Sequence, residues 1–188
     1  MSDSAGERPR WVAEADLRIP FEGGAIRAWR RNDAEALVRH ADDYDVWKNL
    51  GDLFPHPYTP RDAKVWLGGG SESRSELSLA IEAGGELAGG LGLKFPRDPI
   101  YRVTAEVGYW LGRPWWGQGI MTRVVVAFVP WAFERFELER IEAGVFETNP
   151  ASARVLEKAG FALESRQRRH VIKEGRVMDR LLYVRLRD

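Results

Sequence analysis

The sequence predicts a mixed α/β domain built on one sheet that combines antiparallel and parallel strand pairs. Three consecutive stretches of strand-like composition, 77–83, 87–95 and 103–111, are joined by short turns, which is typical of an antiparallel meander. Beyond residue 111, helical and strand-like stretches follow one another, and helical connections imply some parallel pairing. This order favours a mixed sheet over a β-sandwich or a helical bundle.

The composition fits one soluble domain of ordinary size. The chain has 188 residues, with 28 Lys and Arg against 28 Asp and Glu, 44% hydrophobic positions and no Cys. A chain of this length buries roughly 70% of its unfolded surface. Evenly mixed charges argue against a nucleic-acid binder, and the lack of Cys excludes disulfides, thiolate metal sites and Cys nucleophiles. No apolar stretch of about 18 residues suggests a signal peptide or membrane span, so a cytoplasmic protein is expected.

The N-terminal third begins with a polar stretch. Residues 1–20 are expected to form a flexible arm, and a single domain is expected over 21–188. Alternating apolar and polar residues predict a strand over 25–31. Asn32 and Asp33 then offer N-cap oxygens for a helix over 34–41.

An aromatic-rich segment follows over 44–58, where glycine and two prolines favour a short helix and a loop. Thr59 and Pro60 predict the cap and first residue of another helix, which should end at the three glycines of 68–70. Gly84 and Gly85 mark a hairpin turn within the meander.

The C-terminal half should supply the helical connections. Pro130 lies inside a predicted helix, so we expect a kink or an early end there. A short basic cluster could touch a phosphate, although a solvated strand end is the simpler interpretation. The predicted elements are a helix over 117–136, a strand over 140–146, a helix over 150–159, and strands over 161–171 and 177–186 joined through Glu174 and Gly175; the basic cluster comprises Arg166, Arg168, Arg169 and His170.

The stretch 106–122 carries the strongest chemical signal. A strand there passes through a turn into a helix whose start contains Gly117 and Gly119. The first N–H groups of a helix lack partners and attract anions, and glycines let a ligand approach the backbone. The motif is neither a P-loop, which needs Gly-Lys-Ser/Thr, nor a Rossmann fingerprint, because Thr122 stands where the third Gly should be. Helix capping with tight packing would also explain the two glycines.

Three segments together make a more specific pattern. The stretches 106–111 (EVGYWL), 116–119 (WGQG) and 149–161 (NPASARVLEKAGF) resemble the GNAT superfamily of N-acetyltransferases, and within it the RimJ/RimL-type branch. The likeness extends over about residues 25–187. It implies a meander followed by a β-α-β-α-β-β order with a splayed central strand pair, acetyl-CoA as acyl donor, an amine as acceptor, and no metal.

The resemblance also implies which residues meet the cofactor. Pantetheine would pair with backbone around Trp110 and Leu111, and Asn149 and Ser152 would lie near its distal end, although Asn149 is also an ideal helix cap. The family motif usually opens with Arg or Gln where this chain has Pro114. The implied pyrophosphate loop comprises Trp116, Gly117, Gln118, Gly119, Ile120, Met121 and Thr122.

Direct transfer of an acyl group to an amine needs a base, an acid and donors for the developing oxyanion. Glu106 lies in an otherwise apolar strand, where burial would make its carboxylate a usable base. The alternative is a Glu paired with an Arg across the sheet. By the resemblance, Ser152 would protonate the leaving thiolate, with backbone N–H near Leu111 as oxyanion donor.

The acceptor is expected to carry an α-amine. Deprotonation at pH 7 costs about 1 kcal/mol for an α-amine and about 4.6 for lysine, so a protein N-terminus or a small amine of similar pKa is favoured. Trp47, Phe54 and Tyr58 would wall the acceptor pocket, with core packing as the alternative.

Other features leave several questions open. The histidines, at 40, 56 and 170, are scattered, which gives metal catalysis little support, although His56 could enter the acceptor pocket. A homodimer is plausible from the family and from the 8 tryptophans. A non-catalytic acyl-CoA-binding or sensor module and a purely structural domain are the competing functions, and a longer acyl donor such as succinyl stays open.

Overall fold

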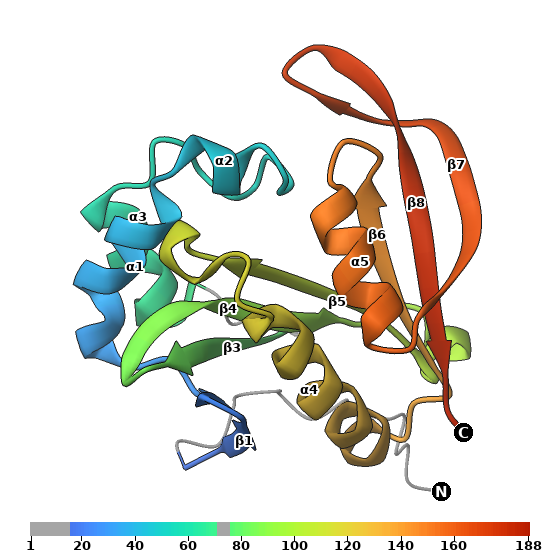
Figure 1. Ribbon diagram of the computed structural model, residues 1–188, viewed down its shortest axis with the longest axis horizontal. Helices are drawn as coiled ribbons and strands as arrows, with labels where there is room; N and C mark the ends of the chain where they lie inside the picture. Colours follow the sequence, from blue (N-terminus) through green and yellow to red (C-terminus); the bar gives the residue numbers. More distant parts are fainter. Residues whose placement is uncertain (1–15, 71–75) are drawn as a thin grey trace, which may run out of the picture.

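A single eight-stranded sheet organises the protein (Figure 1). The computed structural model describes residues 16–70 and 76–188. The strand order is β1-β2-β3-β4-β5-β6-β8-β7, and every neighbouring pair is antiparallel except β5 and β6. The predicted mixed sheet is therefore confirmed. The strands are β1 (Arg18–Phe21), β2 (Gly24–Arg27), β3 (Glu76–Ala83), β4 (Glu86–Lys94), β5 (Thr104–Leu111), β6 (Arg140–Phe146), β7 (Ala162–Lys173) and β8 (Arg176–Leu186).

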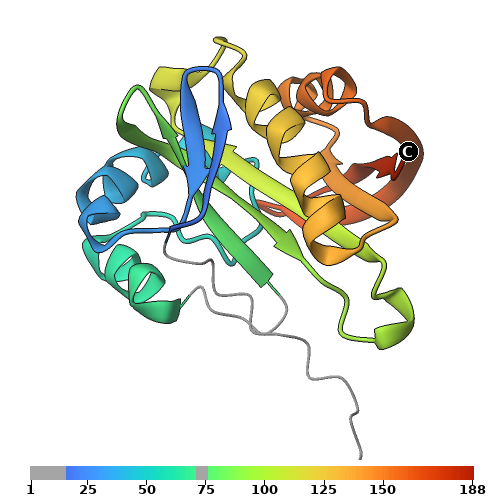
Figure 2. The ribbon, with the colours of Figure 1, turned by 90° about the horizontal axis from the view of Figure 1, so that it is seen from below.

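The helices cover both faces of this sheet (Figure 2). The long α4 packs against β1, β2 and β6, and α5 packs against β6 and β7, whereas α1 packs against β4 and α3. The helices are α1 (Ala34–Ala41), α2 (Tyr44–Trp47), α3 (Pro60–Val65), α4 (Ile120–Phe136) and α5 (Pro150–Lys158), with shorter turns η1 (Arg31–Asp33), η2 (Trp66–Gly70), η3 (Pro99–Tyr101) and η4 (Arg113–Trp115).

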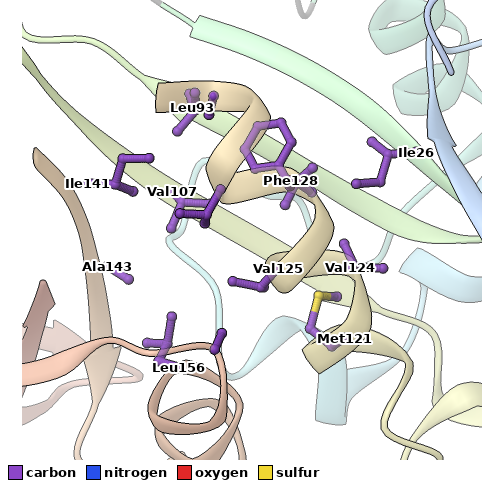
Figure 3. Packing of buried hydrophobic residues seen from close by; sticks show 14 of the residues in the cluster. Ile26, Leu93, Val107, Met121, Val124, Val125, Phe128, Ile141, Ala143 and Leu156 are labelled. Atoms are coloured by element: carbon purple, nitrogen blue, oxygen red, sulfur yellow. The ribbon is translucent and has the colours of Figure 1, made fainter. Parts of the chain in front are cut away.

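Two hydrophobic clusters lie on opposite sides of the sheet. The larger one joins the sheet to α4 and α5, with Phe128 fully buried at its centre (Figure 3). The smaller one joins α1 and α3 to the other face through Leu37 and Tyr58. Alternation along β5 sends Val107 into the larger cluster and Trp110 to the smaller one. Side chains of even-numbered β5 residues, Glu106 included, thus face the α1 side.

The first strand begins earlier than predicted. Residues Arg18–Phe21 form β1, which pairs with β2 in the register Arg18 to Arg27, so the expected arm over 1–20 wrongly included the start of the sheet. A four-residue edge strand containing Pro20 gives a weak sequence signal, because Pro is tolerated only at sheet edges. Residues 1–15 lie outside the described part of the chain.

Asp33 does not cap α1 as predicted. Its carboxylate forms two 2.8 Å hydrogen bonds with the guanidinium of Arg27 and accepts the backbone N–H of Arg30 at 2.7 Å. Glu82 accepts a further hydrogen bond from Arg27 at 2.7 Å. Strand β2 ends at Arg27, short of the predicted residue 31, and these partners compensate the charge of the buried Arg27.

Helix α4 differs from its prediction in its first residue and in its passage through Pro130. It begins at Ile120 rather than Gly117, because Gly117 and Gly119 have positive φ angles of 74° and 71°. It also continues through Pro130 to Phe136, so an early end is wrong. Buried residues on both sides of Pro130, among them Phe128 and Phe133, offset the cost of about 3 kcal/mol of an interior proline.

Several local predictions are confirmed. Thr59 caps α3 through a capping box with Asp62 and is followed by Pro60. Glu174 and Gly175 form the β7–β8 turn with φ angles of 50° and 74°, as a tight hairpin requires. The resulting hairpin extends beyond the rest of the sheet (Figure 1).

Candidate active site

The site begins where the sheet opens between β5 and β6. The two strands pair in parallel only over Thr104–Glu106 and Arg140–Glu142. Beyond Glu106, β5 continues to pair with β4 up to Leu111, and β6 continues to pair with β8 up to Phe146. The predicted splay of the central strands is therefore present, and one side of β5 faces a gap.

The predicted pyrophosphate loop lies at the far end of this gap, between η4 and α4. Gly119 is the N-cap of the 17-residue α4, and no other atom lies within 4 Å of where a Cβ on Gly117 would be. The unpartnered N–H groups at the start of a long helix favour an anion. Ile120 and Met121 are buried, so these two residues can offer only backbone N–H groups to a ligand.

Side chains around the loop are already used within the protein. The indole N–H of Trp116 donates to the Leu111 carbonyl at 2.6 Å, and the amide of Gln118 donates to the Pro114 carbonyl at 2.7 Å. Arg113 forms an ion pair with Asp45 of α2. Trp116 is thus already bonded to the Leu111 carbonyl, one of the backbone groups expected to pair with pantetheine. A carbonyl oxygen has two lone pairs, so this one can accept a second hydrogen bond.

Ser152 lies on the α4–α5 side of the gap and is held from two directions. Its backbone N–H donates to the Asn149 side chain at 3.1 Å, which confirms Asn149 as the cap of α5. Its hydroxyl lies 2.9 Å from the hydroxyl of Tyr109 in β5. Burial raises the pKa of Tyr109 to about 12, so the phenol is protonated at neutral pH. The Tyr109–Ser152 hydrogen bond therefore spans the gap from β5 to α5.

Glu106 lies on the opposite face of the sheet, at the last paired position before the gap. Its side chain is 43% exposed and its carboxylate forms an ion pair with Arg180 of β8. The expected burial of Glu106 is therefore wrong, and the alternative of an Arg partner across the sheet is confirmed. The strand enters the larger core cluster through its other face, with Ala105 and Val107 on either side of Glu106.

The three predicted acceptor residues have different environments. Trp47 stacks against His56 with ring centroids 5.1 Å apart, and its ring lies 3.5 Å from the Nζ of Lys173. Phe54 packs edge-on to Trp110 of β5 at 5.7 Å. Tyr58 is a core residue with 4% exposure, so the alternative of core packing holds for this ring.

Four residues of the site were missed by sequence analysis: Tyr109, Gly144, Lys173 and Arg180. Tyr109 was inside the motif that pointed to the gap, and strand alternation could have placed it on the same face as Val107. Arg180 and Lys173 gave no signal, because each meets its partner through strand register or through a hairpin far along the chain.

In residues 16–70 and 76–188, no group of three or more His, Asp or Glu side chains could hold a metal ion. No helix in the same part of the chain is long and apolar enough to cross a membrane.

This geometry agrees with the comparison to known families. Residues 25–162 match the family described as the acetyltransferase (GNAT) domain. This chain belongs to the GNAT family of N-acetyltransferases. The residues matched to the GNAT family include the splayed strands, the Gly117–Gly119 turn and Ser152.

Individual members of the GNAT family are similar to this chain in sequence or in fold. The probable N-acetyltransferase YjcK of Bacillus subtilis is 50% identical over 72 residues, which is 38% of this chain and 40% of that protein. The structure of RimL, a ribosomal L7/L12 α-N-protein acetyltransferase in complex with coenzyme A, has a TM-score of 0.79 at 23% identity and covers 90% of this chain and 98% of its own. Mycobacterium smegmatis RimJ in complex with CoA-disulfide has a TM-score of 0.78 at 26% identity, covering 90% and 86%. The RimJ/RimL-like GNAT fold is therefore established.

Proposed function

We propose that the protein transfers the acetyl group of acetyl-CoA to a primary amine. The observation that carries this proposal is the juxtaposition of the β5–β6 gap with the Gly117–Gly119 turn at the start of α4. A gap lined by strand backbone suits an extended amide-containing arm, and a helix N-terminus free of side chains suits its phosphates.

The donors and acceptors present at the site suit acetyl-CoA. The backbone N–H groups from Gly117 to Thr122 would hold the pyrophosphate, and the gap side of β5 at Trp110 and Leu111 would hold the pantetheine arm. Acetyl-CoA, when bound, supplies a thioester whose carbonyl carbon accepts an amine nitrogen. RimL and RimJ, both in complex with coenzyme A species, support this choice of donor.

Two side chains carry the proton transfers in this proposal. Glu106, on the α1 side, would accept a proton from the acceptor amine at a carboxylate oxygen. Ser152, on the α5 side and hydrogen-bonded to Tyr109, would give its hydroxyl proton to the leaving sulfur as the C–S bond breaks, and would regain a proton from water. In this proposal Glu106 approaches the reacting carbonyl from one face of the sheet, where the C–N bond forms, and Ser152 from the other, where the C–S bond breaks.

We propose an α-amine as the acceptor, on a protein N-terminus or on a small molecule. An α-amine reaches its neutral form at pH 7 at a cost about 3.6 kcal/mol lower than lysine. The name of RimL gives the α-amine of ribosomal protein L7/L12 as its acceptor, which supports the same class here.

The first test is thermal unfolding with acetyl-CoA, desulfo-CoA or ATP, followed by thiol release with an amine panel. A ligand at 100 times its Kd adds about 2.7 kcal/mol of stability, so both CoA forms should raise Tm and ATP should not. Glu106→Gln should keep the CoA-dependent rise and lose most of the transfer rate. Tm shifts without transfer to any amine would favour the non-catalytic acyl-CoA-binding module, and no Tm shift would refute the proposal.

A further inference from the structure

The ion pair between Glu106 and Arg180 lies in an unusual place. Arg180 belongs to β8, and β6 lies between β8 and the β5 strand that carries Glu106. The guanidinium therefore crosses a whole strand to reach its partner. It does so over Gly144 of β6, the position diagonal to Arg180 in the β6–β8 register.

Gly144 provides the space for this crossing. A Cβ at this position would lie 2.0 Å from Nε and 2.2 Å from Nη2 of Arg180. Any side chain at residue 144 would push the guanidinium away from Glu106. The absence of a side chain on β6 thus determines that a cation reaches the mouth of the β5–β6 gap.

Two features make this pair exchangeable. Arg180 also donates from Nη1 to Gln167 at 3.0 Å, so its guanidinium stays in position without Glu106. The Glu106 side chain is 43% exposed, so solvent and solutes reach its carboxylate, whereas Arg180 is 17% exposed. A ligand that supplies an opposite charge to each member can therefore replace the pair.

Neighbouring cations are already committed: Arg140 pairs with Glu142, the register partner of Glu106, and with Glu164. Lys173 is 3% exposed, donates to Asp52 at 2.7 Å and lies over the ring of Trp47. Asp179, next to Arg180 in the chain, is paired with Arg166 at 2.5 Å. Of these groups, Arg180 is the one that combines a planar two-pronged donor with a partner that is reached from solvent at the gap.

We propose that Arg180 is an acceptor-binding residue that selects amines carrying a nearby carboxylate. This inference rests on the proposed acetyl transfer. The acceptor carboxylate takes the place of Glu106 on the guanidinium, and the acceptor amine takes the place of Arg180 on Glu106. Binding of such an acceptor therefore both orients the amine and releases the Glu106 carboxylate to accept its proton. Two sources share this chemistry: a free α-amino acid, and a peptide whose N-terminal residue is Asp or Glu.

The test compares matched acceptors in binding and in turnover. The pairs are serine with serinamide, and an Asp-Ala-Ala amide peptide with its Asn-Ala-Ala counterpart. Kd is measured by calorimetry on protein saturated with desulfo-CoA, and kcat/KM by thiol release from acetyl-CoA. In at least one pair, the acceptor with the carboxylate should bind at least tenfold tighter, and the pair that discriminates identifies the source.

Variants isolate the role of the guanidinium. Arg180→Gln should bring that ratio close to 1 by weakening only the carboxylate acceptor, and Gly144→Ala should do the same while keeping the arginine. Arg166→Gln, an exposed β7 arginine, is the matched control and should keep the ratio. A wild-type ratio near 1 in both pairs, an absence of acceptor binding, or an unchanged ratio in Arg180→Gln would overturn the inference. If the carboxylate acceptor binds more tightly but no acetyl group is transferred, only the proposed function is refuted. If acetyl transfer occurs with no difference between the paired acceptors, only the role of Arg180 is refuted.

Discussion

The hydroxyl of Ser152 depends on Tyr109 for its orientation, and this dependence can be measured. Ser152→Ala should lower kcat on the order of 100-fold, the low end for loss of an acid. Tyr109→Phe should lower kcat by roughly 3–10-fold, because it removes one hydrogen bond worth about 1 kcal/mol. The double variant should be no slower than Ser152→Ala, since Tyr109 acts through Ser152. Multiplied losses in steady-state thiol release would show that the two residues act separately.

Tyrosine titration offers a pH-dependent test of the same environment. Burial raises the pKa values of Tyr58 and Tyr109 to about 12, against about 10 in the unfolded chain. The folded state thus disfavours their ionised forms, and the stability they contribute is complete below pH 10 and is lost as the pH rises toward 12. Absorbance at 295 nm should show a late ionisation that each of Tyr58→Phe and Tyr109→Phe reduces. Ionisation of both near pH 10 in folded protein would contradict the described burial.

At the scale of elements, the turn before α4 can be separated into strain and ligand binding. Gly117 and Gly85 both have positive φ, at 74° and 85°, and nothing lies within 4 Å of a Cβ at either position. Each change to Ala should cost roughly 1 kcal/mol from the left-handed backbone. Only Gly117→Ala should also weaken the Tm rise produced by desulfo-CoA, because Gly85 lies in the β3–β4 turn. Equal CoA responses in the two variants would remove Gly117 from the cofactor site.

The buried ion pair between Arg27, at the end of β2, and Asp33 leads to a second prediction at this scale. Asp33→Ala leaves the guanidinium of Arg27, which is 4% exposed, without its two-pronged partner. The loss should be about 3–5 kcal/mol in urea unfolding, because removing one partner of a buried ion pair is costly and Glu82 reaches only Nε of Arg27. Glu35→Ala breaks the exposed pair with Arg39 and should change stability by less than about 0.5 kcal/mol. A small effect of Asp33→Ala would mean that Glu82 alone satisfies Arg27.

At the scale of the whole molecule, the β7–β8 hairpin is fastened to the α2 segment. Lys173 reaches Asp52 at 2.7 Å and Trp47, and Tyr44 donates to Glu174 at 3.0 Å. Lys173→Met should loosen this contact and raise KM for the acceptor several-fold, with KM for acetyl-CoA unchanged. Lys94→Met removes a lysine from an exposed pair at 3.9 Å and serves as the control. A rise in KM for acetyl-CoA instead would place the contact on the cofactor side.

Local signals account for what the sequence could predict. Thr59, Asn149 and the Glu174–Gly175 turn act within a few residues, so the caps and the hairpin agree with the structure. The splayed strands and the cofactor turn followed from the resemblance to the GNAT family. The Glu106–Arg180 pair could not be predicted, because 74 residues separate its members and only the β6–β8 register with a glycine between them brings them together. Asp33 was misassigned because its buried partner lies on another element.

The short parallel joint between β5 and β6 has a consequence for cooperativity. Within residues 16–70 and 76–188, the ladder between the strands β1–β5 and the strands β6, β8 and β7 consists of three residue pairs, next to which Glu139 and Arg140 donate to the Val103 carbonyl. We expect native-state hydrogen exchange to divide the sheet into these two parts, each opening with its own free energy. A molecule lodged in the gap touches both parts at once and would fasten them together. With such a ligand bound, hydrogen exchange would then show one opening event for the whole sheet in place of two.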